Sequence, residues 1–134
     1  MSLVTHAQNL SSSLLKAGLV PGSAPLIPDD FKPLTELSVR FGERQVNLGN
    51  LFRASECKQA PSVSFTPENT WSSKTYTLLL IDPDAPTPDD PKFAYWRHWV
   101  LSGLVPGMDD GDALNVLTEY LGPGPKDEYA IGLD

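Results

Sequence analysis

The chain has 134 residues, of which 40% are hydrophobic, and its formal net charge is −7. A chain of this length predicts a single domain over residues 1–134, with one core. No apolar run reaches about 18 residues, so we expect no membrane span. The first residues also lack the basic and apolar regions of a signal peptide. Cys57 is the single cysteine, which excludes an internal disulfide and indicates a reducing, cytoplasmic compartment.

The charge is unevenly placed along the chain. Residues 1–60 hold six Lys or Arg and five Asp or Glu, whereas residues 61–134 hold four and twelve. An acidic half repels a phosphate backbone, so nucleic acid is not expected as a partner. A local pocket for one lipid headgroup remains compatible with this charge.

The N-terminal region predicts one helix. Four apolar side chains recur there at helical spacing: Leu3, Ala7, Leu10 and Leu14. Gly18 is a natural stop, so we expect an amphipathic helix over residues 5–17. Lys16 is the one cation on its polar face, which favours packing on the core over membrane binding. Four prolines in residues 21–33 then predict an extended surface connector.

The rest of the chain predicts short strands. Alternating or continuous apolar residues indicate strands at residues 37–41, 46–48, 61–65, 76–81 and 96–104. Gly42-Glu43 would turn the first strand into the second, and residues 51–61 are expected to be irregular. A short helix is expected over residues 112–120. The pattern therefore predicts a mainly β core over about residues 34–126 with peripheral helices.

A stiff acidic loop follows the strand at residues 76–81. In Asp82-Pro83-Asp84-Ala85-Pro86, the prolines restrict the backbone and so hold both carboxylates in place. If the two apolar strands pair, these carboxylates come close to His98. A His–Asp hydrogen bond would orient the imidazole. The alternative is an ordinary acidic turn beside a core histidine. The Ala85–Pro86 bond is a candidate for the cis form.

On a regular strand, Trp96 and His98 share one face while Arg97 and Trp99 share the other. A phosphate could then bind on the histidine side of the site and an amine on the aspartate side. The run Gly122-Pro123-Gly124-Pro125 lets backbone N–H groups approach an anion closely, although such repeats usually form only a loop. Cys57 is expected to be a structural thiol, since no histidine lies near it in sequence.

The order DPDAP, then WRHW, then YLGPGP resembles the phosphatidylethanolamine-binding protein family, also called Raf kinase inhibitor proteins. The segment LIPDDFKP and the segments after it resemble fungal members, which include a carboxypeptidase Y inhibitor. The resemblance implies a Greek-key β-sandwich with small peripheral helices and a pocket for phosphate groups, including that of phosphoethanolamine. Carried over by matching positions, the pocket residues are Asp82, Asp84, Pro86, Trp96, His98, Gly122, Gly124 and Pro125.

The chain also departs from the family pattern. Phe93 stands where many members have Tyr, and the Ala94–Tyr95 bond lies where members often have a cis bond. The sequence ends at Asp134 with no counterpart of the second pocket histidine, an inner strand and the last helix, as if truncated at the C-terminus. We therefore expect an incomplete pocket, and an incomplete sheet that favours a homo-oligomer or a strand from another chain.

Three classes of function are compatible with these features. The first is a non-enzymatic regulatory protein that binds a phosphate or phosphoethanolamine headgroup; the resemblance implies inhibition of a serine carboxypeptidase or a kinase. The second is a degenerate relative that acts only through protein contacts. The third is a hydrolase using Asp82, Asp84 and His98 as acid–base groups or metal ligands. Because the sequence has no nucleophile elbow and no second pocket histidine, we expect no catalytic residue, metal or cofactor.

Overall fold

Short strands and one long helix form the part of the chain that the structure describes. The computed structural model describes residues 2–67, 74–83, 85, 89–90, 92–93, 95–106, 115–124 and 131–132. The helical elements are α1 (Leu3–Lys16), the turn η1 (Leu19–Ser23) and the 3-10 helix η2 (Ala54–Cys57). The strands are β1 (Leu37–Phe41), β2 (Arg44–Gln45), β3 (Leu51–Phe52), β4 (Ser62–Phe65), β5 (Tyr76–Asp82), β6 (Trp96–Leu104), β7 (Asn115–Thr118) and β8 (Ile131–Gly132).

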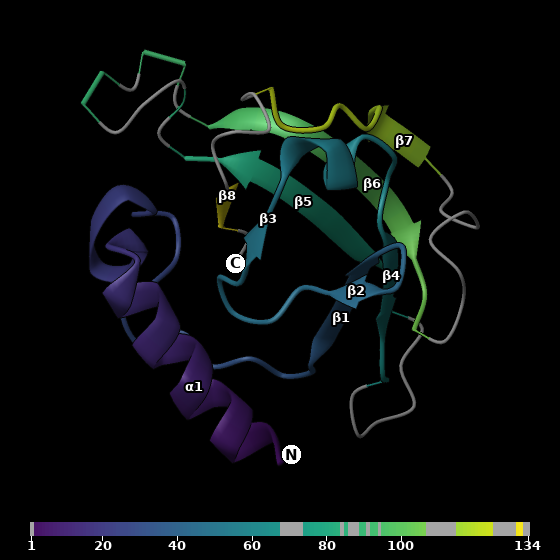
Figure 1. Ribbon diagram of the computed structural model, residues 1–134. Coiled ribbons are helices and arrows are strands. Elements are labelled where there is room, and N and C mark those ends of the chain that lie inside the picture. Colours follow the sequence, from purple (N-terminus) through teal and green to yellow (C-terminus); the bar gives the residue numbers. More distant parts are fainter. Residues whose placement is uncertain are drawn as a thin grey trace.

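The strands pair into antiparallel sheets (Figure 1). Their orders are β2-β1-β4, β5-β6-β7 and the short pair β3-β8. One buried cluster joins the first two sheets: Val63 comes from β4, and Trp99, Leu101 and Leu104 come from β6. Partly buried side chains of β1, β4 and β5 pack against this cluster. This arrangement confirms the mainly β sandwich that the sequence predicts, because each sheet buries one apolar face against the other.

Most of the expected strands are confirmed. β5 and β6 occupy the two apolar runs, and β4 occupies the run before Pro67. β1 and β2 form the expected hairpin, with Arg40 opposite Gln45 and Phe41 opposite Arg44. Gly42 lies in the turn between these strands and has a φ of +62°. Glycine adopts this left-handed backbone conformation more easily than other residues do. β2 ends at Gln45 and so lies just before the range 46–48 at which the second strand was expected, and residues 51–61 contain β3 and η2 where we expected irregular structure.

The prediction of a helix over residues 112–120 is wrong. Residues 115–118 instead form β7, which pairs antiparallel with β6 and places Thr118 opposite Val100. Residues 112–114 lie outside the described part. β-branched side chains at 116 and 118 favour a strand, and the edge of β6 offers backbone groups with which such a strand can pair. Pairing with a distant strand therefore overrides a weak local helical pattern.

β6 carries two extra residues relative to β5. Arg97 lies opposite Ile81 and Trp99 opposite Leu80, so His98 is inserted between two consecutive pairs as a β-bulge. A second irregularity lies near Gly103, whose φ is +77°. The first bulge breaks the expected alternation, because Arg97 is exposed whereas Trp99 is buried. The prediction that these two side chains share a face is therefore wrong.

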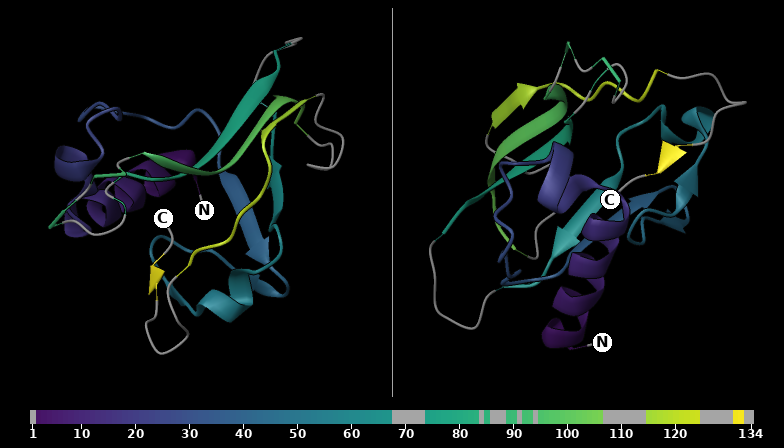
Figure 2. Two further views of the ribbon diagram at one scale, coloured as in Figure 1. Left: turned by 90° about the horizontal axis from the view of Figure 1, so that it is seen from above. Right: turned by 90° about the vertical axis from the view of Figure 1, so that its left-hand side faces the viewer.

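α1 lies along one side of the strands (Figures 1 and 2). It begins two residues earlier than expected, because the Ser2 side chain accepts a hydrogen bond of 3.1 Å from the Thr5 N–H and so caps the helix. Gly18, with a φ of +71°, follows the helix as predicted. The side chains of α1 pack mainly on η1 and the connector, through the buried residues Leu14, Val20 and Ala24.

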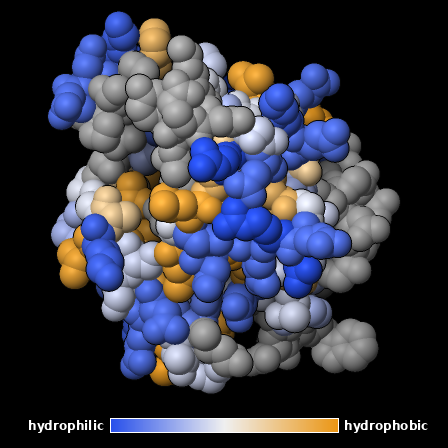
Figure 3. Space-filling view, viewed as in Figure 1, coloured by the Kyte–Doolittle hydropathy of each residue, from blue (hydrophilic) through white to orange (hydrophobic). Residues whose placement is uncertain are grey.

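Polar contacts join α1 to more distant described residues. The Ser13 hydroxyl donates to the Leu48 carbonyl at 3.1 Å, and His6 lies 3.8 Å from the Glu36 carboxylate. No helix among the described residues is long and apolar enough to cross a membrane. In the view of Figure 3, hydrophilic side chains cover much of the surface, with apolar side chains showing between them.

Candidate functional site

The ends of β5 and β6 bring several of the expected site residues together. Asp82, the last residue of β5, lies opposite Trp96, the first residue of β6. Asp82 is half-buried, as is His98 at the nearby bulge. Strand pairing therefore puts Asp82, Trp96 and His98 at one end of this sheet, as expected. Three further candidates, Asp84, Pro86 and Pro125, lie outside the described residues.

His98 is joined to the segment that follows β7. Its ring Nδ1 lies 2.7 Å from the Leu121 carbonyl oxygen, and the Leu121 N–H donates to the His98 carbonyl at 2.8 Å. A carbonyl can only accept, so Nδ1 carries the proton and Nε2 remains for another partner. The sequence predicted an aspartate as the group that orients this ring, whereas the described contact is with a backbone carbonyl. This contact places Gly122, the residue after Leu121, close to the histidine in space.

Gly122 packs closely against η2. A Cβ atom added to Gly122 would collide with the backbone carbonyl of Cys57, whereas one added to Gly124 would meet nothing within 4 Å. The expected role of both glycines was to expose backbone N–H groups to an anion. Close packing against Cys57 therefore explains why residue 122 is a glycine, whereas the space around Gly124 would accept a side chain. A side chain at 122 would push the segment away from η2.

The same Cys57 carbonyl accepts a hydrogen bond from the Tyr120 hydroxyl. The Tyr120 ring packs at 5.7 Å from the Trp99 ring and 6.5 Å from the Phe41 ring, measured between centroids. Burial raises the pKa of Tyr120 to about 12, with Cys57 as the second cause. Tyr120 thus fixes the residues that lead to Gly122. In the sequence this tyrosine stands out only as part of the YLGPGP motif, and its contact with Cys57 leaves no local signal.

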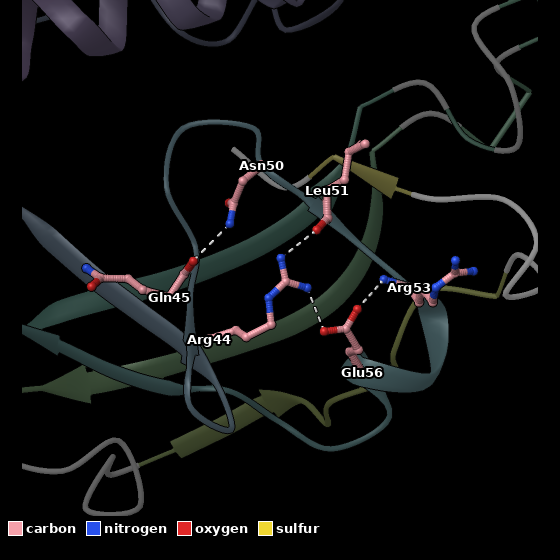
Figure 4. A network of polar contacts seen from close by, with 6 residues as sticks. All are labelled: Arg44, Gln45, Asn50, Leu51, Arg53 and Glu56. Carbon is pink, nitrogen blue, oxygen red and sulfur yellow. Dashed lines mark hydrogen bonds and ion pairs between the residues drawn. The ribbon is translucent and has the colours of Figure 1, made fainter.

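A polar network around Arg44 and Glu56 holds η2 in place (Figure 4). The Arg44 guanidinium binds the Glu56 carboxylate at 2.6 Å and donates to the Leu51 carbonyl at 3.0 Å. Glu56 also accepts from the Arg53 N–H at 2.9 Å. The backbone hydrogen bond from Arg53, and then the Arg44 contact, lower the pKa of Glu56 from its ordinary value. The network fixes the residue immediately before Cys57.

Cys57 itself is fully buried and is not in a disulfide. Burial raises the pKa of its thiol, and the negative charge of Glu56 raises it further. A thiol that resists ionisation is a poor nucleophile. The expectation of a structural cysteine agrees with this environment, since its carbonyl makes the contacts described above.

Aromatic side chains lie beside Trp96. Trp96 is 45% exposed, and its ring meets the Phe93 ring edge-on at 6.1 Å between centroids. The Lys92 ammonium lies 5.6 Å from the Phe93 ring centroid. Tyr95, just before β6, has a φ of +61°, which is uncommon for a bulky residue. The two bonds expected as cis candidates involve Pro86 and Ala94, which lie outside the described residues.

Within the described ranges, no group of three His, Cys, Asp or Glu side chains could hold a metal ion. A cavity of about 120 Å³ lies elsewhere, between α1 and the connector, and is lined by side chains that include Leu10, Leu14, Val20 and Phe31. None of the expected pocket residues lines it. The candidate site is therefore defined by the positions of Asp82, Trp96 and His98, and not by this cavity.

Comparison with known proteins identifies the family. The model of the family described as "Phosphatidylethanolamine-binding protein" matches residues 29–130. The chain is 32% identical over 99 residues to Protein MOTHER of FT and TFL1 homolog 2 of rice, Oryza sativa subsp. japonica, covering 74% of this chain and 55% of that protein. The chain belongs to the phosphatidylethanolamine-binding protein family.

Solved structures share the fold. Carboxypeptidase Y inhibitor, in its complex with the cognate proteinase, matches with a TM-score of 0.73 and 26% identity, over 89% of this chain and 65% of that one. The phosphatidylethanolamine-binding protein of Plasmodium falciparum matches with a TM-score of 0.69 and 26% identity, over 86% and 62%. This chain therefore spans less than two-thirds of the length of these relatives.

Proposed function

We propose that this chain is a non-enzymatic regulatory protein that binds a phosphate-bearing headgroup, such as phosphoethanolamine, as a single domain in the cytoplasm. The proposed site lies where β5 ends and β6 begins, beside the segment that contains Leu121. The observation that supports it most is the reciprocal hydrogen bonding between His98 and Leu121. It sets a histidine ring next to a glycine-rich segment, two groups suited to binding a phosphate.

Each part of the proposed site has a chemical role. With Nδ1 bonded to the Leu121 carbonyl, the imidazole offers Nε2–H to a phosphate oxygen when the ring is doubly protonated. The backbone N–H of Gly124 is the donor that this segment offers to the phosphate, and a Cβ atom added to Gly124 would meet nothing within 4 Å. Asp82 attracts the ammonium group of phosphoethanolamine. The exposed Trp96 ring supplies an aromatic face for the same cation.

We further propose that the regulated partner is a protein, either a serine carboxypeptidase-type protease or a kinase. The support is the resemblance to carboxypeptidase Y inhibitor, whose solved structure is a complex with its cognate proteinase. The buried, ionisation-resistant thiol of Cys57 fits a regulatory protein better than an enzyme with a cysteine nucleophile.

A second candidate is a relative that acts only through protein contacts and binds no headgroup. The observation that favours it is the contact of His98, whose Nδ1 bonds the Leu121 backbone carbonyl. In that case, His98 would serve only to join β6 to the residues after β7.

Isothermal titration with phosphoethanolamine distinguishes the two candidates. We expect binding by the wild type, at least about tenfold weaker binding by His98→Gln, and unchanged binding by the control His6→Gln. His6 is the other histidine of the chain and lies on α1. Inorganic phosphate and ethanolamine, titrated separately, show which half of the ligand is recognised. No binding by a folded wild type would refute the headgroup site and favour the second candidate.

A further inference from the structure

We propose that the cavity between α1 and the connector binds a small hydrophobic amine, meaning one aromatic ring or branched alkyl group that carries an ammonium. The cavity has a volume of about 120 Å³. The residues that line it come from α1, η1 and the turn at residues 28–31, and none belongs to β5 or β6. It is therefore a different site from the proposed headgroup site at the strand ends.

One wall of the cavity is a single face of α1. The lining residues from this helix are Ala7, Leu10, Ser11, Leu14 and Leu15. Each is three or four residues from another member of the set, so all of them lie on one side of the helix. Four are apolar, and the Ser11 hydroxyl adds one polar group. This wall suits an apolar group that carries one polar substituent.

The other wall comes from the connector and the turn before it. Val20 and Pro21 of η1 contribute to it, followed by Pro28, Asp29 and Phe31. The Phe31 N–H donates to the Pro28 carbonyl at 3.1 Å, which closes a turn around residues 29 and 30. Each proline ring fixes its own backbone φ, so the wall is stiff and resists collapse onto the helix. The cavity is therefore formed before a ligand arrives.

The volume limits the size of the ligand. A cavity of about 150 Å³ with apolar walls holds benzene. The cavity of this chain, at about 120 Å³, therefore suits one ring or a branched alkyl group whose polar substituent stays outside. Its apolar lining continues onto the surface, where Leu15 is 62% exposed and Phe31 is 48% exposed. A ring placed against these side chains removes apolar surface from water, which favours binding.

Charge favours an amine over other small apolar ligands. Asp29 alone carries a charge among the described residues that line the cavity, and it is exposed at the surface. Within the described ranges, its carboxylate has no ion pair with a side chain. A carboxylate beside apolar walls attracts an ammonium and repels an anion. Fatty acids and aromatic acids are thus disfavoured, whereas an amine can place its apolar group in the cavity and its charge beside Asp29.

Two-dimensional NMR of the whole chain, with benzylamine as the probe, tests where the amine binds. We expect saturable shifts of the backbone amides of residues 7–15 and 29–31, and no displacement of benzylamine by phosphoethanolamine. Benzyl alcohol, which has nearly the same size, should bind more weakly, and benzoate more weakly still. Shifts confined to residues 96–98, no saturable shift at all, or equal binding of the three probes would each overturn the proposal.

Filling the cavity should prevent this binding. Ala7→Phe puts a ring where the ligand would lie, so we expect the dissociation constant for benzylamine to rise at least about tenfold. Ser12→Phe is the matched control, because it adds the same ring to α1 at a residue that does not line the cavity. Circular dichroism shows whether each variant is folded. Equal effects of the two substitutions would refute binding in the cavity.

Asp29→Asn tests the charge while keeping the shape of the side chain. Because Asp29 is exposed, this variant should fold, so it decides the question even where Ala7→Phe does not fold. We expect the dissociation constant for benzylamine to rise about threefold and that for benzyl alcohol to stay unchanged. Asp30→Asn, at the next residue, which does not line the cavity, is the control. His98→Gln should leave benzylamine binding intact, so a failure of the headgroup site is told apart from a failure of this one. Unchanged benzylamine binding by Asp29→Asn would overturn the proposal.

Discussion

The Tyr120 hydroxyl donates a hydrogen bond to the backbone carbonyl of Cys57, from which it is separated by 63 residues in sequence. The same carbonyl lies where a side chain on residue 122 would have to go. The 3-10 helix η2 and the segment after β7 are thus held together by one backbone group. Because Leu121 in turn bonds His98, the position of the candidate site depends on this contact.

Gly122→Ala should destabilise the protein, because the new methyl group would collide with the Cys57 carbonyl, which is backbone and cannot move aside easily. We expect a loss of about 1–3 kcal/mol in the free energy of unfolding, measured by urea denaturation. Gly124→Ala is the matched control, since its position is open. Equal losses in the two variants would contradict the close packing at residue 122.

Tyr120→Phe removes the hydroxyl and leaves the Cys57 carbonyl without that donor. The aromatic packing on Trp99 is retained, so the expected loss is about 1–3 kcal/mol in the free energy of unfolding. Tyr95→Phe, on a residue outside this contact, is the control. A stability equal to the wild type would mean that the hydrogen bond contributes nothing measurable.

Alkaline pH should destabilise the wild type through Tyr120. Its pKa is raised to about 12 from an ordinary value of 10, so the folded state binds the phenolic proton more tightly than the unfolded state. This stabilisation is complete below pH 10 and is lost as the pH rises from 10 through 12. Urea denaturation at several alkaline pH values should therefore show a steeper decline in the wild type than in Tyr120→Phe. Parallel declines would contradict the raised pKa.

Acidic pH should destabilise the folded protein through Glu56. Its pKa is lowered from 4.5 by the Arg53 N–H and the Arg44 guanidinium, so the unfolded state binds this proton more tightly. The contribution is present above pH 4.5 and is lost as the pH falls through the lower folded-state pKa. Glu56→Gln should flatten the pH dependence of stability in that range, measured by urea denaturation. Glu43→Gln, in the β1–β2 turn, should behave like the wild type.

The sequence predicted the strands whose apolar pattern is strong in itself. β5 and β6 follow from continuous apolar runs, and their pairing accounts for Asp82, Trp96 and His98 at one sheet end. β7 was mistaken for a helix, because its structure depends on pairing with β6. The bulge at His98 and the contact between Tyr120 and Cys57 left no local pattern in the sequence. Both arise from the packing of segments that are distant in the chain.

The N-terminal helix rests on a buried cluster of its own, formed by Leu14, Val20 and Ala24, which shares no buried residue with the cluster between the sheets. Separate clusters allow separate opening reactions, since each loses its own apolar contacts. Amide protons of α1 should therefore exchange with solvent faster than those of β6. We therefore expect the helix to detach while the strands remain folded, so a ligand in the cavity between α1 and the connector would oppose that opening without contacting the site at the strand ends.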